Sequence, residues 1–199
     1  MRRSLTKRQR LRVQTIVSAL VIVVVAAGGA AFFLTGGSST SSSPAPARTV
    51  RHVAEPAGPV PSDSARMVCA PEAQRELATA LGVEPTEVST PTWVDHVYSC
   101  QYVYPSGVMP VSVKELSSRA ETSAYFDSLR AQYGVSQQLK GVAQGAFVTA
   151  NGSLVLRKDY KVLFVDTSAL SVPFGQGFKT RAQVAVGVGV TVLGCWTGA

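Results

Sequence analysis

The chain has few of the residues from which metal and catalytic sites are usually built. Its 199 residues include two histidines and three cysteines, and no Cys-x-x-Cys pair occurs in the sequence. Zinc sites usually take their ligands from closely spaced cysteines and histidines. We therefore expect no metal site, and the sequence indicates no cofactor. The Gly-x-Ser-x-Gly elbow of many hydrolases and the Walker phosphate loop are missing too.

One weak hydrolase signal remains, because Asp95 and His96 come just before Ser99. A hydrolytic triad needs a nucleophile, a base and an orienting acid that the fold brings together. Adjacent residues on a strand point to opposite faces, so this spacing does not make a catalytic pair. We expect that the protein is not an enzyme. The alternative is a small tethered or secreted hydrolase that uses His96.

Charged residues are also missing from Thr15 to Leu34, a run of mostly apolar residues that follows six basic ones. As a helix that rises about 1.5 Å per residue, this run would span about 30 Å, the thickness of the hydrocarbon core. The positive-inside rule places the basic tail, residues 1–14, in the cytoplasm. We therefore expect a single-pass protein of the cell membrane, with a transmembrane helix at 15–34 and the rest of the chain outside the cell.

A cleaved signal peptide has a similar basic start and apolar middle, and this alternative stays open. The small residues 28–31 suit a signal peptidase. Against cleavage, Phe32, Phe33 and Leu34 continue the apolar run to full membrane length. The uncleaved anchor is our prediction.

Residues 35–65 contain seven serines and five prolines but little that a core could bury. This composition predicts a disordered linker, which leaves residues 66–199 as one extracytoplasmic domain. Most of the net charge of +7 lies in the basic tail. From Arg66 onward the chain mixes eleven basic with ten acidic residues. The domain therefore lacks the basic face that a nucleic-acid partner needs, and the membrane is the expected partner.

Three segments of the domain are predicted to be helical. Pro71 begins the first helix, which Gly82 ends after Leu81. A capping box of Ser118 and Glu121 begins the second helix, which Gly134 ends. The third segment, 180–196, has valines that alternate as in a strand, but it also has a capping box and an apolar helical face. We predict a helix there, with the strand as the alternative.

The remaining patterns predict strands. Aromatic and β-branched residues favour a single strand at 93–104 that pairs with 108–116, where Pro110 indicates an edge or a bulge. A meander follows at 145–150, 153–157 and 160–167. Short connections make the sheet mainly antiparallel. The predicted fold class is therefore α+β, with two or three helices packed on the sheet.

The three cysteines all lie in the predicted extracellular domain, where two of them should pair. Cys69, just before the first helix, and Cys100, inside the first strand, are the best candidates. Cys195 lies beside Trp196, and we expect it to be free and buried. A Cys69–Cys195 bridge is the open alternative, because spacing alone does not fix connectivity.

This order of elements resembles the small extracytoplasmic domains of actinobacterial lipoproteins and of receptor-kinase sensors of the PknH type. The likeness covers residues 67–199: Cys69 opens a helix, Cys100 precedes an aromatic strand, and a central helix, a meander and an apolar last helix follow. The resemblance implies a binding or sensing role in the cell envelope, without known catalysis.

Four aromatic residues crowd the first predicted strand: Trp93, Tyr98, Tyr102 and Tyr104. Core packing around the disulfide explains them. The alternative is a binding surface for an envelope peptide, protein or glycan, because tyrosine and tryptophan are favoured at such sites. We therefore expect a binding or sensor module of the cell envelope, with a hydrolase or a purely structural component as alternatives.

Overall fold

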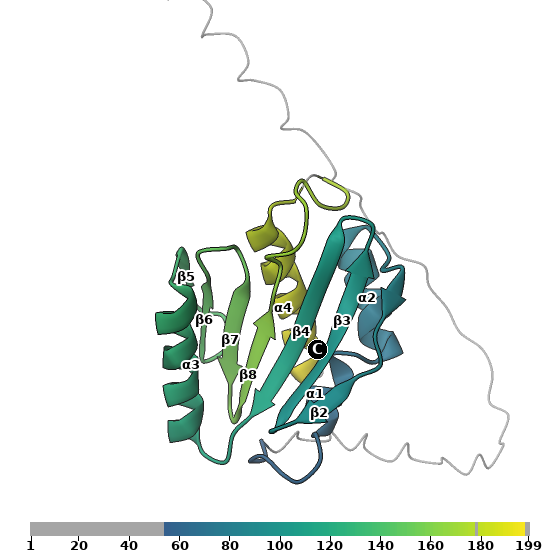
Figure 1. Cartoon of the computed structure of the whole chain (residues 1–199). Helices are drawn as coiled ribbons and strands as arrows, with labels where there is room; N and C mark the ends of the chain where they lie inside the picture. Colours follow the sequence, from purple (N-terminus) through teal and green to yellow (C-terminus); the bar gives the residue numbers. More distant parts are fainter. Residues whose placement is uncertain (1–53, 178, 198–199) are drawn as a thin grey trace, which may run out of the picture. The chain divides into compact units, whose positions relative to one another are not determined.

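The computed structural model describes residues 54–177 and 179–197, which form one α+β domain (Figure 1). Its helices are α1 (Asp63–Met67), α2 (Pro71–Leu81), α3 (Arg119–Tyr133) and α4 (Arg181–Thr197). Its strands are β1 (Glu87–Val88), β2 (Thr92–Val94), β3 (Val97–Tyr104), β4 (Gly107–Glu115), β5 (Gln137–Leu139), β6 (Gly145–Val148), β7 (Leu154–Lys158) and β8 (Lys161–Val165). Within the described residues, no helix is both long enough and apolar enough to cross a membrane. The predicted transmembrane helix at 15–34 lies outside those residues.

The strands form a single antiparallel sheet, which confirms the predicted α+β class. Its order is β1-β3-β4-β8-β7-β6-β5, and β2 also pairs with β3. Consecutive hairpins account for β3–β4 and for β5 to β8. The two groups of strands join in the middle of the sheet, where β8 pairs antiparallel with β4. Val113 is opposite Leu163 there, and Glu115 is opposite Lys161.

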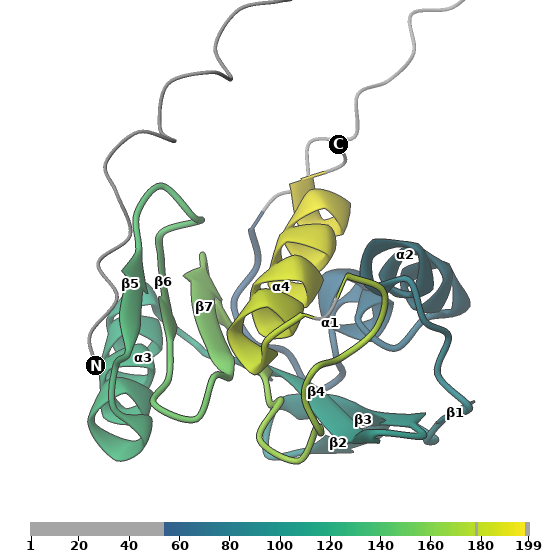
Figure 2. The same ribbon diagram turned by 90° about the horizontal axis from the view of Figure 1, so that it is seen from above.

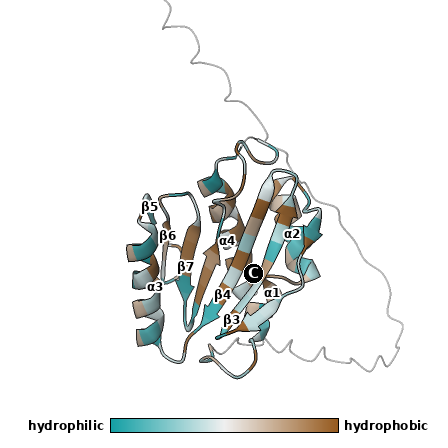
Figure 3. Cartoon of the chain, in the orientation of Figure 1, coloured by the Kyte–Doolittle hydropathy of each residue, from teal (hydrophilic) through white to brown (hydrophobic). Residues whose placement is uncertain are grey.

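The two faces of the sheet carry different helices (Figure 2). Helices α1, α2 and α4 cover one face, and their buried residues join those of β3, β4, β7 and β8 in the main core. Helix α3 covers the other face, where Phe126 and Leu129 meet Phe147, Val155 and Val162 from β6, β7 and β8. In Figure 3 brown, hydrophobic residues dominate β7, whereas α3 carries many teal ones.

The helix signals in the sequence are confirmed by their caps. Gly82 ends α2 in the left-handed conformation, with φ at 70°. The Ser118 hydroxyl accepts a hydrogen bond from the Glu121 amide at the start of α3. Thr180 and Gln183 exchange two hydrogen bonds at the start of α4, so the contested segment is a helix. The valine alternation failed as a strand signal because Val184, Val188 and Val192 also recur every four residues, and these three are buried on one side of α4.

The single strand predicted at 93–104 is instead the hairpin of β2 and β3. Asp95 and His96 form its two-residue turn, both with positive φ, at 49° and 57°. Neither residue is a glycine, so the usual sequence signal for this turn is missing. The sequence analysis also missed α1, β1 and β5, which are short elements.

Pro110 does not lie on an edge strand, because β4 runs between β3 and β8. It lies just beyond Val111–Val165, where the pairing of β4 with β8 ends. Its carbonyl accepts the Asp166 amide at 2.9 Å. A proline, which has no N–H, is tolerated at the end of a ladder.

The cysteines pair as predicted. Cys69 and Cys100 form a disulfide with 6.0 Å between their Cα atoms, which ties the start of α2 to β3. Cys195 is free, but it is only half-buried, and its thiol donates to a Glu76 carboxylate oxygen at 3.2 Å. The expectation of a buried, purely apolar Cys195 was therefore wrong, because α4 turns this residue toward the polar face of α2.

Candidate functional site

Two of the four aromatic residues proposed as a binding surface are buried. Tyr102 is 0 % exposed and Tyr104 is 3 % exposed, and both belong to the main core beside Cys100. Burial raises the pKa of both phenols, that of Tyr104 to about 12. These two residues therefore pack around the disulfide and do not present a surface to a ligand.

The other two aromatic residues are half-buried. Tyr98 packs against the edge of the main core. The Trp93 indole donates a hydrogen bond to the Pro59 carbonyl at 3.2 Å, and its ring contacts His96 edge-on at 5.6 Å. Trp93 therefore holds a neighbouring segment of the chain in place.

The residues of the hydrolase alternative do not come together. His96 is exposed in the β2–β3 turn, and its ring contact is with Trp93. The Ser99 hydroxyl pairs with Thr92 at 3.0 Å. Within the described part of the chain, no hydrogen bond joins His96 to Asp95 or Ser99. The structure thus supplies no nucleophile and base in contact at this position.

The segment that contacts Trp93 belongs to the predicted linker. Residues 54–62, here named the strap, cross the end of the sheet before α1 begins at Asp63. The Ala57 amide donates to the Leu116 carbonyl at 3.0 Å, and Ala65 in α1 is fully buried. The linker prediction for 35–65 is therefore wrong from Ala54 onward: its composition suited a spacer, but hydrogen bonds from Ala57 and Ser62 and the buried Ala65 fix it to the domain. Residues 35–53 lie outside the described residues.

Beneath the strap, β4 and β8 end in a buried ion pair. Glu115 and Lys161 are opposite each other in the register of the two strands, and their residues are only 3 % and 7 % exposed. The Lys161 ammonium nitrogen lies 3.9 Å from a Glu115 carboxylate oxygen. The other partner of Glu115 is Ser62, whose hydroxyl and backbone amide both donate to that carboxylate. Ser62 thus ties the strap to the buried ion pair by hydrogen bonds.

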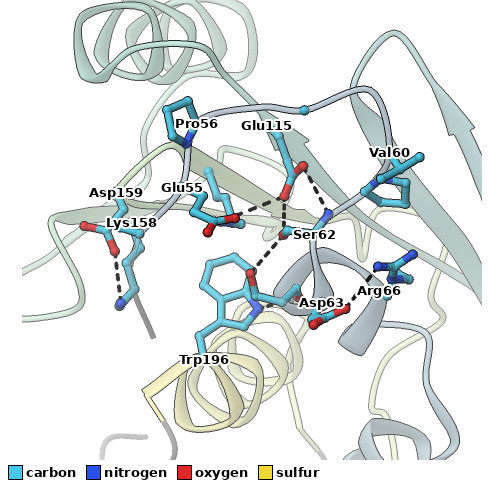
Figure 4. Close-up of a pocket in the computed structure, with 15 residues that line it drawn as sticks. Glu55, Pro56, Val60, Ser62, Asp63, Arg66, Glu115, Lys158, Asp159 and Trp196 are labelled. Atoms are coloured by element: carbon cyan, nitrogen blue, oxygen red, sulfur yellow. Dashed lines mark hydrogen bonds and ion pairs between the residues drawn. The ribbon is translucent and has the colours of Figure 1, made fainter. Parts of the chain in front are cut away.

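These residues line a pocket of about 510 Å³ (Figure 4). Its walls are the strap, α1, the β7–β8 turn and Trp196 from α4. The Trp196 indole donates to the Ser64 carbonyl at 2.8 Å, which fixes α4 against α1. Pockets of this size hold small molecules in many proteins. The pocket therefore combines adequate volume with buried charged groups.

Four charged residues at the rim of the pocket form two ion pairs. Arg66 contacts Asp63 at 3.0 Å, and Lys158 contacts Asp159 at 3.2 Å. Partial burial opposes ionisation of Asp159, but Lys158, Gln144 and Arg119 outweigh it and lower the pKa of that carboxyl. The rim is therefore charged on both sides but locally neutralised.

The sequence analysis missed Glu115 and Lys161. A signal was present, because Met109, Val111 and Val113 alternate into the core and Glu115 continues the same parity. Lys161 likewise shares its face with Leu163 and Val165. A charged residue at a core-facing position of a strand is uncommon, and two such positions meet at this end of the sheet.

A second cavity of about 500 Å³ lies between α2 and α4. It includes Cys195 and Glu76, together with the exposed Val190. Burial and the neighbouring Glu76 carboxylate raise the pKa of the Cys195 thiol to about 11. A thiol held in its protonated form is a poor nucleophile, so this cavity offers less chemistry than the pocket under the strap.

Within the described residues, no cluster of three or more His, Cys, Asp or Glu side chains has the arrangement of a metal site. Comparison of the chain with protein-family models, with curated proteins and with solved structures gives no match in any of the three.

Proposed function

We propose that this protein is a membrane-anchored binding or sensor module of the cell envelope, and that the pocket under the strap holds its ligand. The observation that carries the proposal is the buried Glu115–Lys161 pair, which lines that pocket. A buried ion pair contributes little net stability, because desolvation of both charges offsets their attraction. Its position in the wall of a cavity supports a role in recognition rather than in folding.

The strap supports a sensing role in particular. It forms one wall of the pocket and is joined to the core through Ser62, Ala57 and the Trp93–Pro59 contact. The same segment leads back along the chain toward the predicted transmembrane helix at 15–34. A ligand that contacts the strap therefore acts on the piece of chain that connects the domain to the membrane.

The two tryptophans of the chain allow a direct test, because Trp196 lines the pocket and Trp93 holds the strap. The full-length protein in detergent is titrated with small-molecule fractions from the envelope of the source cells. We expect a saturable change in tryptophan fluorescence. Trp93→Phe and Trp196→Phe then identify which indole reports it.

A pocket-filling variant supplies the specificity control. Gly58 lines the pocket, and a side chain added there would meet only the Val60 carbonyl nearby. Gly58→Leu should abolish the titration, whereas Ala131→Leu on the exposed side of α3 should leave it unchanged. Turnover of an envelope substrate that His96→Ala abolishes would instead support the hydrolase. If no fraction gives a saturable change that depends on Gly58, the pocket is not a ligand site.

The membrane anchor is tested separately. Protease added to intact cells should remove the domain and leave a short membrane-bound fragment. Mature protein found free in the medium, with its N-terminus near Ala31, would support the cleaved signal peptide.

A further inference from the structure

The groups around Lys161 indicate what kind of ligand the pocket takes. The Lys161 side chain is 9 % exposed, and its ammonium carries three N–H donors. Its one partner in the described part of the chain is Glu115, and their separation of 3.9 Å is longer than a hydrogen bond. Because Lys161 lines the pocket and its ammonium makes no hydrogen bond to a described residue, its donors are open to an acceptor that comes from outside the chain.

Three of the four acids of the pocket have closer partners, and the fourth, Glu55, is exposed. Glu115 accepts both the hydroxyl and the amide of Ser62, while Asp63 and Asp159 have their cations at 3.0 and 3.2 Å. Among the three bases of the pocket, Arg66 and Lys158 donate to carboxylates, whereas the Lys161 ammonium makes no hydrogen bond to a described residue. A ligand oxygen that reaches Lys161 completes the site.

The charge balance selects among anionic ligands. The lining residues include four acids, Glu55, Asp63, Glu115 and Asp159, against three bases, Arg66, Lys158 and Lys161. Their formal sum is −1, so the lining repels every anion, and a doubly charged phosphate meets about twice the repulsion of a single carboxylate. A single carboxylate brings one negative charge to the open ammonium and little more. Resting on the proposed function, we infer that the pocket binds small molecules with one carboxylate that are otherwise neutral or cationic, and that Lys161 holds the carboxylate.

A matched pair of probes tests this inference on the full-length protein in detergent. N-acetyl-L-alanine carries one carboxylate, and N-acetyl-L-alaninamide differs from it only at that group. Loss of a charge-assisted hydrogen bond of this kind lowers affinity about 10- to 100-fold. We expect the acid to bind more tightly than the amide by that factor, and inorganic phosphate to bind more weakly than the acid. Tryptophan fluorescence and chemical shifts measure the three affinities.

Variants then assign the preference to Lys161. Lys161→Met should reduce the difference between acid and amide to less than about threefold. The control Lys140→Met changes an exposed lysine outside the pocket and should leave the difference intact. Because Lys161→Met could disturb the fold, Glu115→Gln provides a second readout: it removes the competing anion and keeps an acceptor for Ser62. It should tighten binding of the acid, which structural damage would not do.

The outcomes separate this inference from the proposed function. Equal affinities for acid and amide, tighter binding of phosphate, or a preference that survives Lys161→Met would each overturn the carboxylate assignment. If no probe binds while an envelope fraction still gives the response that depends on Gly58, the ligand class is wrong but the pocket stands. If neither the probes nor any fraction binds, the proposed function fails with it.

Discussion

The two faces of the sheet are packed in different ways. The face under α1, α2 and α4 holds a large apolar cluster that includes the Cys69–Cys100 disulfide. The face under α3 holds five buried residues, and the guanidinium groups of Arg130 and Arg157 lie over its phenylalanine rings. The helices on the first face are held by apolar contacts and the disulfide. Helix α3 is held on the second face by a few aromatic and aliphatic side chains, with two guanidinium groups packed on the rings.

The two faces are therefore expected to contribute unequally to the stability of the domain. Buried apolar area provides most of the favourable free energy of folding, so the main core should dominate the stability. The pocket lies at one end of that same face, where Glu115 ends the apolar row of β4. The α3 face, with its smaller cluster, should open locally before the rest of the domain.

Removal of the disulfide from the main core should lower the free energy of unfolding more than any other change considered below. Cys69 and Cys100 are separated by 31 residues in sequence, and closing such a loop stabilises a protein by about 3 to 4 kcal/mol on the chain-entropy model. We expect the double variant Cys69→Ala/Cys100→Ala to lose about this much free energy of unfolding in urea titrations. Cys195→Ala is the control and should change little. A loss below about 1 kcal/mol would show that the crosslink does not stabilise the main core.

Substitution of two glycines of α4, Gly187 and Gly189, should change the stability of the domain in opposite directions. A Cβ at Gly189 would overlap a methyl group of Leu154, which is 1 % exposed, whereas a Cβ at Gly187 meets only Leu81 at 4.0 Å. Overpacking costs about 1 to 3 kcal/mol, and alanine favours a helix over glycine by about 1 kcal/mol. Thermal unfolding should therefore rank Gly187→Ala above wild type and Gly189→Ala below it. Equal stability of the two variants would mean that α4 is loosely packed on β7.

The contact between Gly189 and Leu154 joins residues that are distant in sequence. For this reason the positions of the helices were easier to predict from the sequence than the way the helices pack. Local signals suffice for Pro71 and Gly82 around α2 and for the capping boxes, because the interacting residues are neighbours in sequence. Gly189 gives no such signal, since its partner lies on β7. The valines around it suit a strand and a helix equally well, and the capping box of Thr180 and Gln183 is the local signal that favours the helix.

The candidate site could not be predicted for the same reason. Glu115 and Lys161 meet because β8 returns to pair with β4, after α3 and three further strands. The strap was hidden by its composition, which is typical of a disordered linker although Ser62 and Ala57 bind the domain. The aromatic residues misled for a physical reason as well, because tyrosine is equally suited to a surface and to the buried position of Tyr102.

Tyr102 and Tyr104 offer the next comparison, with smaller effects. The Tyr102 hydroxyl donates to the Val68 carbonyl at 2.6 Å, whereas the Tyr104 hydroxyl is buried with no hydrogen-bond partner among the described residues. Tyr102→Phe leaves a carbonyl unpaired and should cost about 1 to 2 kcal/mol. Tyr104→Phe removes an unsatisfied group and should be neutral or slightly stabilising. Denaturant titration of both variants measures this, and an equal loss in the two would indicate an unseen partner for Tyr104.

The same tyrosines predict how stability depends on pH. Burial raises the pKa of both phenols above the ordinary value near 10, that of Tyr104 to about 12, so the folded state favours the protonated form. Their contribution is complete below pH about 10 and is lost as the pH rises toward about 12. The unfolding free energy should therefore fall between pH about 10 and about 12, and less so in Tyr104→Phe. The Cys195 thiol acts in the same direction, so the measurement is made in Cys195→Ala.

The smallest effect is expected on the α3 face. The Arg130 guanidinium lies 4.9 Å from the Phe147 ring centre and 5.4 Å from that of Phe126, and it donates to Gln138 on β5 at 2.9 Å. Arg130→Lys keeps the charge but loses the planar group, which should cost about 0.5 to 1 kcal/mol. Hydrogen exchange should quicken in α3 and β5 but not in α4. Arg75→Lys, at an exposed pair with Glu72, is the control. A loss as large as that from Tyr102→Phe, spread over both faces, would mean that α3 and the main core unfold as one unit, and the separation of the two faces would then be wrong.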